Sequence, residues 1–472
     1  SESESESESE HIIINYKLTH MQQIKLKKGL DIPMDGRAAR TYGSARRPAI
    51  YKIVPDQYAG LTPKIMVKEG DKVKAGSALI HDKQFEDLLV TSPVSGKVVE
   101  INRGERRKVM YIAIEADATI AYETFPIGKD ANVKALLLQS GLWTYIKQRP
   151  YDCIAMPSKQ PKAIFITTFD SAPLAPDYAF VMQGKANLIQ AGIDALSQLA
   201  PVYVGLNAKQ TVAEFAGLKN CTKYSVEGPH PAGNISVQIN HVAPMAKGET
   251  VFTVNIQDLA IIGKFFTKGI VDAERLVALT GDMAYQPQYY RILPGMPASA
   301  ILTCNAHKEL TVRYISGNVL SGKQIDLNDI LCYRANQLSV IAEGTERHEF
   351  MGWLLPRFND FNASNTDPAK CFDNGLMRWL FGEKHYNWDA RLKGGRRAII
   401  VSGEYDKVFP MDIYPEHLIK AMIAGNIDKM EQLGAYEVAP EDFALCEYVC
   451  TSKMPLQEIV RQALDNLKKE IE

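Results

Sequence analysis

Residues 63–101 contain short apolar runs separated by turn signals, and this spacing constrains the fold more than any other feature of the chain. Glycine or proline interrupts the runs at Gly70, Gly76, Pro93 and Gly96. The runs are too short for helices but suit strands joined by tight turns. Glycine accepts turn conformations that a Cβ disfavours. The segment therefore predicts a compact, strand-rich domain.

The same segment is similar to biotinyl and lipoyl carrier domains, in which an enzyme modifies one lysine at a hairpin tip. Asp82-Lys83 resembles the lipoyl Asp-Lys pair, and Ser92-Pro93 resembles the Ser-Pro that follows it. The spacing expected from Pro93 places the modified position at Phe85, however, and not at Lys83. We therefore expect a scaffold with a solvated hairpin lysine, and intact-mass spectrometry would reveal a modified Lys83.

Length and composition describe a soluble multidomain protein. The chain has 472 residues, which is enough for about three domains. Its formal net charge of −1 supplies no general electrostatic attraction for nucleic acid. The apolar run at 259–263 ends at Lys264 and is too short for a membrane span. No signal peptide is visible, so we expect any membrane association to depend on a partner or a surface.

Two further features concern processing and redox state. Five Ser-Glu repeats open residues 1–20, which we expect to be a disordered tag or leader, and the folded chain is expected to start at Met21. An odd number of scattered cysteines predicts reduced thiols in the cytoplasm. These cysteines are Cys153, Cys221, Cys304, Cys332, Cys371, Cys446 and Cys450.

Strands and helices alternate in the middle of the chain, which predicts an α/β domain with a mostly parallel, Rossmann-like sheet. The expected helices are 136–145, 186–199 and 256–266, and the expected strands are 163–168, 201–205 and 251–255. The full prediction is an α/β multidomain protein. Its parts are a carrier-like β-sandwich at 21–120, the α/β domain at 121–286, a β-grasp module at 287–345 and an aromatic-rich, mostly helical domain at 346–472.

The last two domains are predicted from changes in periodicity. Short apolar runs predict the strands of the β-grasp module at 291–295, 300–303, 310–315 and 316–322. Helical spacing returns near the C-terminus, where we expect helices at 416–433 and 455–471.

No local motif for a redox cofactor is present. The sequence contains no G-x-G-x-x-G at a strand–helix junction and no Walker loop. The α/β domain begins with Gly141-Leu-Trp143-Thr-Tyr145, where a glycine-rich loop would bind a phosphate. Trp143 and Tyr145 would block close approach to the backbone, which argues against a flavin there. We assign no catalytic, cofactor-binding or metal-binding residue.

Cys446 and Cys450 form the one close cysteine pair, and helical spacing would place them on the same face. A four-cysteine cluster needs two more thiolates nearby, so a packed structural pair is the simplest interpretation, with a metal ligand or a redox-active thiol as alternatives. His348, Glu349 and His385 could meet in space, but no zinc spacing is present.

Two clusters are candidates for contact with a partner. Arg103, Arg106, Arg107 and Lys108 form a basic turn that is either a solvated hairpin or a site for phosphate or an acidic partner. A second cluster is rich in aromatic residues and arginine, a composition that suits a domain core, a docking surface or a site for a flat ligand such as a quinone. It contains Phe350, Trp353, Arg357, Phe358, Phe361, Phe372, Arg378, Trp379, Phe381, Tyr386, Trp388 and Arg391.

From Met21 to the C-terminus, the chain resembles the A subunits of bacterial sodium-translocating NADH:quinone reductases. Thr451 stands where that family tends to have proline. The segments that carry the resemblance are 27–33, 91–104, 141–143, 312–322, 410–415 and 444–450.

The resemblance implies a peripheral cytoplasmic subunit of a six-subunit inner-membrane complex. That complex passes electrons from NADH through flavins and an iron–sulfur centre to quinone and exports sodium. The family is similar in plan to the NADH-binding subunit of respiratory complex I and to a subunit of the Rnf complex, which carry a flavin loop and clustered cysteines. We expect this chain to lack the flavin loop and the clustered cysteines. We expect it to serve assembly of the complex, interaction with quinone, or both. The alternative is an Rnf-type subunit with its own iron–sulfur clusters.

Overall fold

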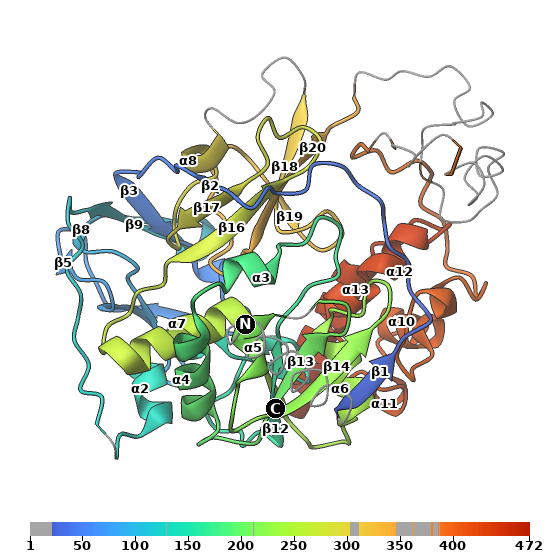
Figure 1. Ribbon diagram of the computed structural model, residues 1–472, viewed down its shortest axis with the longest axis horizontal. Coiled ribbons are helices and arrows are strands. Elements are labelled where there is room, and N and C mark those ends of the chain that lie inside the picture. The colour runs from blue at the N-terminus through green and yellow to red at the C-terminus, as the bar shows by residue number, and fades with distance from the viewer. Residues whose placement is uncertain are drawn as a thin grey trace, which may run out of the picture.

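A computed structural model describes residues 21–128, 130–210, 212–302, 311–345, 361, 379–380, 386 and 388–472. The strands of this part of the chain form four sheets, and helices cover both faces of the largest (Figure 1). The predicted tag or leader at 1–20 lies outside the described residues. So do several members of the candidate clusters, namely Cys304, His348, Glu349, Phe350, Trp353, Arg357, Phe358, Cys371, Phe372, Arg378, Phe381 and His385.

The N-terminal region forms two small antiparallel sheets, as the turn-punctuated segment predicts. Gly70 and Gly76 have φ values of 96° and 99°, so both occupy the left-handed region that favours glycine. The first sheet contains β3 (Ile50–Ile53), β9 (Val109–Ala116), β8 (Gly96–Arg103) and β5 (Lys72–Val73). The second contains β4 (Pro63–Ile65), β6 (Ala78–Asp82) and β7 (Leu89–Thr91).

The α/β domain is built on a seven-stranded sheet whose central strands are parallel, as strand–helix alternation predicts. In spatial order the strands are β1 (Gln22–Lys25), β14 (Thr222–Glu227), β13 (Val202–Asn207), β12 (Ala163–Thr167), β15 (Val251–Asn255), β10 (Lys147–Arg149) and β11 (Cys153–Ile154). β10 runs antiparallel to both of its neighbours.

The central strand β12 shows why its sequence is apolar throughout. Ile164 and Ile166 belong to one buried core, whereas Ala163 and Phe165 belong to another. Successive side chains of a strand point to opposite faces, so both faces of the sheet are covered. The helices of this domain are α2 (Val133–Gln139), α3 (Tyr178–Val181), α4 (Ala186–Leu196), α5 (Ala213–Ala216), α6 (Ile235–Val242) and α7 (Ile256–Lys268).

α4 and α7 pack side by side on one face of the sheet (Figure 1). A Cβ added to Gly263 would lie 1.7 Å from the carbonyl oxygen of Leu188, and one added to Gly192 would lie 2.6 Å from that of Leu259. Glycine on both helices therefore permits a backbone approach that alanine would prevent.

The third sheet is mixed and links distant parts of the chain. Its strands, in spatial order, are β19 (Lys323–Ile325), β18 (Val312–Ser316), β20 (Gln337–Ala342), β16 (Arg275–Thr280), β17 (Tyr289–Ile292) and β2 (Tyr42–Gly43). β2 comes from the N-terminal region and pairs in parallel with β17, so this sheet also ties the start of the folded chain to its centre.

Two predicted strands of the β-grasp module are wrong. Residues 300–303 were expected to be a strand, but the short helix α8 (Ser299–Leu302) occupies this place, and the carbonyl of Ala298 accepts hydrogen bonds from the N–H groups of Ile301 and Leu302. Residues 317–322 form a turn after β18, in which the side chain of Asn318 accepts hydrogen bonds from two backbone N–H groups. In the second segment, local turn chemistry around Asn318 replaces the expected strand.

The C-terminal helices cover the other face of the seven-stranded sheet (Figure 1). They are α10 (Pro415–Ile423), α11 (Ile427–Gln432), α12 (Ala444–Val449) and α13 (Leu456–Ile471). The helix predicted at 416–433 is split in two because Gly425 has a φ of 63° and Asn426 caps α11. None of the helices in the described ranges is both long and apolar enough to cross a membrane.

Five short 3-10 helices complete the described elements. They are η1 (Pro55–Gln57), η2 (Glu105–Arg107), η3 (Leu142–Tyr145), η5 (Tyr405–Lys407) and η6 (Pro440–Phe443). The helix predicted at 136–145 thus consists of the end of α2 followed by η3, with Gly141 at a φ of 76° between them.

Candidate functional site

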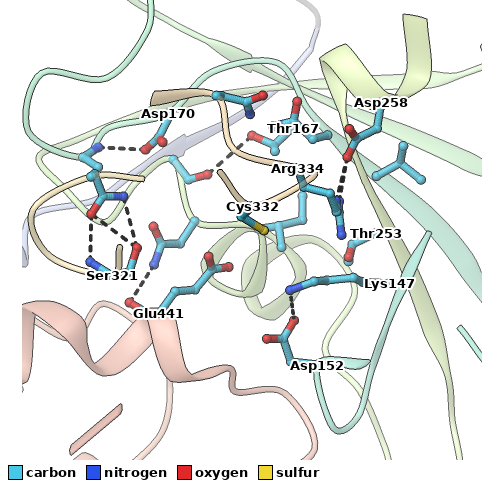
Figure 2. Close-up of a pocket in the computed structure, with 18 of the residues that line it drawn as sticks. Lys147, Asp152, Thr167, Asp170, Thr253, Asp258, Ser321, Cys332, Arg334 and Glu441 are labelled. Atoms are coloured by element: carbon cyan, nitrogen blue, oxygen red, sulfur yellow. Dashed lines mark hydrogen bonds and ion pairs between the residues drawn. The ribbon is translucent and has the colours of Figure 1, made fainter. Parts of the chain in front are cut away.

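A cavity of about 290 Å³ opens at the carboxyl ends of β12 and β15 (Figure 2). After β12 the chain continues to β13 on one side, and after β14 it returns to β15 on the other side of β12. Neighbouring strands whose connections leave in opposite directions create a crevice, which is where open α/β sheets bind ligands. The volume lies near the lower limit of small-molecule pockets, about 300 Å³.

Every major part of the described chain contributes to the walls of this cavity. Gln57 comes from the N-terminal sandwich, Arg334 from the segment before β20, and Glu441 from η6. The sheet supplies Thr167 from the end of β12 and Thr253 from β15. The site thus depends on how the domains pack together.

Asp258, in the first turn of α7, pairs with two arginines. Its carboxylate lies 2.7 Å from Arg275 and 2.8 Å from Arg334, and it is fully buried. Although burial opposes ionisation of Arg334, the charge of Asp258 outweighs it and raises the pKa of the guanidinium above its usual value. Nη1 of Arg334 is buried and has no hydrogen-bond partner among the described residues.

Asp152 pairs with three cations, of which Arg461 is the most distant at 3.9 Å. It lies 3.1 Å from Nζ of Lys147 and 2.7 Å from Nη1 of the buried Arg149. Burial raises its pKa, but the charges of Lys147 and Arg149 more than offset this and lower the pKa to about 2. Arg149 further donates a hydrogen bond to Ser236 at 3.1 Å, which holds it in place.

The opposite side of the cavity is acidic, with Asp170 and Glu441 on its wall (Figure 2). Burial raises the pKa of Asp170. Beside the cavity, burial and then the charge of Glu441 raise the pKa of Asp442 to about 7. The cavity is thus lined by both signs of charge, and Glu441 lies 3.5 Å from the guanidinium of Arg149.

His230 lies in the same wall and is paired with Ser171. Ser171 Oγ accepts a hydrogen bond from the N–H of Gly233 and lies within hydrogen-bond distance, 3.0 Å, of Nδ1 of His230. Burial lowers the pKa of His230 to about 4. Such a weak base is poorly matched to activating a serine near neutral pH, so the pair acts as a structural contact.

The loop expected to block a flavin is part of the hydrophobic core. Trp143 is buried, donates its indole N–H to the carbonyl of Ala155 at 2.6 Å and packs edge-on against Phe252. A Cβ on Gly141 would lie 2.7 Å from Oγ1 of Thr91, so this glycine makes room for the N-terminal sandwich. The side chains of Leu142, Trp143, Thr144 and Tyr145 are all buried, so the loop is part of the packed core.

The structure brings Cys446 and Cys450 into one core cluster with the C-terminal helices. Cys446 is on α12, Cys450 follows that helix, and both thiols are free and buried. The hydroxyl of Tyr405 lies 2.9 Å from Sγ of Cys450. In the described part of the chain, no group of three or more His, Cys, Asp or Glu residues is arranged to hold a metal ion. The geometry favours the packed structural pair.

The hairpin between β6 and β7 carries Lys83, which is exposed. The hairpin is tied down by Asp82, whose buried carboxylate accepts hydrogen bonds from the N–H groups of Thr62, Gln84 and Phe85. The carbonyl of Thr62 also accepts a bond from the N–H of Lys83. These bonds fix the tip, which favours a scaffold over a mobile carrier arm.

The basic turn lies at the tip of the hairpin between β8 and β9, and all four of its cationic residues are exposed. Arg106 and Arg107 have positive φ values of 52° and 61°, and Lys108 pairs with Asp56 at 2.6 Å. The structure thus places these residues together on the surface, remote from the walls of the cavity.

Part of the predicted aromatic cluster is assembled in space. Trp388, Phe361 and Tyr386 pack together, with ring centroids 5.3 to 6.4 Å apart. Trp379 is instead 79% exposed. A further described member, Arg391, pairs with Asp389 at 2.7 Å, so the described members divide into a packed ring group, an exposed tryptophan and a paired arginine.

The residues of the cavity belong to no sequence motif and were not predicted. The ends of the strands at 163–168 and 251–255 could have indicated it, because a parallel sheet with a switch point carries its ligand there. Lys147 and Arg334 carry no local signal, since they reach the cavity only through pairing of β10 with β15 and through packing of the third sheet.

Comparison with known proteins identifies relatives along the chain. Family models match residues 24–117 as the NqrA N-terminal barrel-sandwich hybrid domain, residues 128–271 as the NqrA second alpha/beta domain, and residues 276–326 as the NQRA C-terminal domain. These matches agree with a multidomain protein that contains a barrel-sandwich, an α/β domain and an SLBB-like module.

Curated relatives cover almost the whole chain. The A subunit of the Na(+)-translocating NADH-quinone reductase of Yersinia pestis bv. Antiqua (strain Angola) is 35% identical over 459 residues, which are 95% of this chain and 100% of the relative. The protein of the same name from Haemophilus influenzae (strain 86-028NP) is 34% identical over 458 residues, with the same coverage.

Among solved structures, the NAD+-reducing [NiFe]-hydrogenase in the H2-reduced state is similar with a TM-score of 0.33 and 14% identity, over 45% of this chain and 47% of that chain. This likeness is too low to support an argument about fold or function. The relatives that are aligned over their full length show that the chain belongs to the NqrA family, the A subunits of the Na(+)-translocating NADH-quinone reductases, which are oxidoreductase complexes.

Proposed function

We propose that this chain is a peripheral subunit, on the cytoplasmic side of the bacterial inner membrane, of a six-subunit complex that couples electron transfer from NADH to quinone with sodium export. The proposal is supported by relatives named as the A subunits of such reductases, which the chain matches over their whole length. The protein has no activity alone in this proposal, because NADH, flavin and quinone chemistry belong to the complex.

Within the complex, the chain holds no redox cofactor of its own and serves assembly, contact with quinone, or both. The cofactor-free role is supported by the burial of the loop from Gly141 to Tyr145. Leu142, Trp143, Thr144 and Tyr145 are all buried, so side chains fill the place where open backbone would hold a flavin phosphate.

The α/β domain follows the plan of the NADH-binding subunit of complex I in this proposal, as a Rossmann-like domain that has lost its flavin loop. The spatial order β14, β13, β12, β15, with all four strands parallel, supports a doubly wound origin. The cavity at the switch point would then be a remnant of the ligand crevice of that fold.

Assembly would use exposed aromatic surface. Trp379 is 79% exposed beside Leu380, which is 54% exposed, and exposed aromatic side chains of this kind are typical anchors at protein interfaces. The packed rings of Phe361, Tyr386 and Trp388 instead support a core role for that part of the cluster.

The visible absorption spectrum of the purified full-length chain tests the proposal against the alternative of an Rnf-type subunit with its own clusters. We expect a spectrum without flavin or iron–sulfur bands, whereas the intact complex, purified in parallel, should show flavin bands. A flavin or iron–sulfur band that copurifies with the isolated chain in stoichiometric amount would overturn the cofactor-free role. Failure of the chain to copurify with other subunits of the reductase would overturn the assembly role.

A further inference from the structure

The cavity at the switch point carries an excess of positive charge on one wall. Asp258 is shared by Arg275 and Arg334, and on the same side Asp152 is shared by Lys147 and Arg149. Asp258 balances one of its two arginines. Around Asp152, Arg461 is a third cation at 3.9 Å, and Glu441 pairs with Arg149 at 3.5 Å, so positive charge still exceeds negative charge. The remaining positive charge is partly desolvated and available to a ligand.

Arg334 lines the cavity with a guanidinium group that Asp258 holds in place. Its Nε and Nη2 are held by Asp258, at 2.9 and 2.8 Å, so the guanidinium is fixed in orientation. Nη1 remains buried without a partner among the described residues, although its residue lines the cavity. A buried donor without a partner is costly, and an anionic acceptor in the cavity would remove that cost.

Lys147 and Thr253 extend this donor set. They are register partners on the antiparallel strands β10 and β15, and both line the cavity. Figure 2 shows Arg334, Thr253 and Lys147 on the same side of the cavity, with Thr253 labelled between the two cations. A guanidinium, a hydroxyl and an ammonium in this order are suited to the oxygens of one phosphate or carboxylate.

The opposite wall would contact a different part of the same ligand. Asp170 and Glu441 lie there, and carboxyl oxygens accept hydrogen bonds from hydroxyl groups. Phe169, Ile154 and Leu320 add apolar surface to the lining of the cavity. A ligand with an anionic end and a hydroxylated body would therefore match both sides.

We infer that this cavity binds a small hydroxylated organic anion, whose phosphate or carboxylate group lies against Arg334, Thr253 and Lys147 and whose hydroxyl groups face Asp170 and Glu441. The inference rests on the residues of the cavity alone and does not require the assembly or quinone roles.

Calorimetric titration of the purified full-length chain tests the inference with ribose 5-phosphate, malate and ribose as probes. The first two probes distinguish a phosphate from a carboxylate ligand, and ribose has hydroxyl groups without the anionic group. We expect at least one anion to bind at low ionic strength and ribose not to bind. Lys147→Gln and Arg334→Gln should each weaken the binding about tenfold or more, since each removes a charged donor.

Lys162→Gln is the matched control, because Lys162 is a partly exposed lysine paired with Glu249 and lies outside the walls of the cavity. It should bind the anion as the unaltered chain does. The inference is wrong if neither anion binds, if ribose binds equally well, or if Lys147→Gln binds as tightly as Lys162→Gln. Lys147 is 34% exposed and its substitution should fold, so a folding defect of Arg334→Gln would leave the test decisive. Copurification with the other subunits, measured on the same variants, reports separately on the assembly role.

Discussion

Asp258 and Arg275 form a salt bridge of 2.7 Å in which both side chains are buried, with 0% and 1% of their surface exposed. Asp258 begins α7 of the α/β domain, and Arg275 begins β16 of the third sheet. The guanidinium of Arg275 also donates a hydrogen bond to the carbonyl of Tyr333 at 2.6 Å. The pair therefore joins two domains behind the wall of the cavity.

Replacing Asp258 with Asn should destabilise the protein strongly. The change removes the shared carboxylate from Arg275 and Arg334 and leaves two buried guanidinium groups without their counter-charge. Removal of one partner from a buried ion pair costs about 3–5 kcal/mol. Urea unfolding of the full chain measures this cost. Asp272→Asn breaks a less deeply buried pair with Lys264, in which the side chains are 18% and 24% exposed, and should cost less than Asp258→Asn. Equal losses would contradict a special role for Asp258.

Replacing Gly263 with Ala should also destabilise the protein, although alanine favours helices by about 1 kcal/mol. The new Cβ would lie 1.7 Å from the carbonyl oxygen of Leu188, so α4 and α7 would have to separate. Overpacking of this kind costs about 1–3 kcal/mol or more. The midpoint of thermal unfolding should fall for Gly263→Ala. It should change little for Gly217→Ala, where nothing lies within 4 Å of the added Cβ.

The stability of the protein should depend on His230 at mildly acidic pH. Burial lowers the pKa of His230 from 6.5 to about 4, so between these values the unfolded chain binds a proton that the folded chain does not. Stability therefore rises with pH across this window and is lost as pH falls towards 4. The shift corresponds to roughly 3 kcal/mol.

The measurement for His230 is the difference in unfolding free energy between the unaltered chain and His230→Gln, from pH 4 to pH 7. Comparing the two proteins cancels other titrating groups, above all Asp442, whose raised pKa of about 7 makes stability fall as pH rises through the same range. The difference should grow with pH and level off near 6.5. A difference independent of pH would show that His230 does not titrate as described.

Cys446 and Cys450 should behave as buried packing groups. Burial raises the pKa of the Cys446 thiol well above its usual value, and such a thiol is rarely present as the reactive thiolate. Alkylation of the native chain, followed by peptide mass spectrometry, should leave both thiols unmodified until the protein is unfolded. Cys221, which is partly exposed, serves as the reference. Rapid native alkylation of Cys446, or one bound metal ion lost in Cys446→Ala, would support the alternative roles.

Replacing Trp379 with Ala should weaken assembly more than folding. Its side chain is 79% exposed, so its removal loses little packing within the chain. Copurification of the other subunits of the reductase should fall while the unfolding temperature stays the same. Trp143→Phe is the contrasting variant, because Trp143 is buried and its loss should lower the unfolding temperature. The same prediction holds for Trp353, which lies outside the described residues. Equal loss of stability and of copurification in Trp379→Ala would instead indicate a core residue.

Local sequence determined most of the elements of this protein. The turns at Gly70 and Gly76 and the apolar strands at 163–168 and 251–255 could be predicted, because turn chemistry and side-chain periodicity act between near neighbours. Trp143, which the sequence led us to expect as an obstacle to a flavin, is buried in the core.

Tertiary structure alone decided how the cavity is assembled. The cavity unites Lys147, Thr253, Asp258 and Arg334, which are far apart in the sequence and meet only because β10 pairs with β15 and the third sheet packs on α7. Tertiary packing also made the apolar segment at 299–302 a short helix in place of the expected strand. Periodicity reports which face of an element is buried, but it does not report which partner buries it, so the charge arrangement of the cavity emerges only from the packed domains.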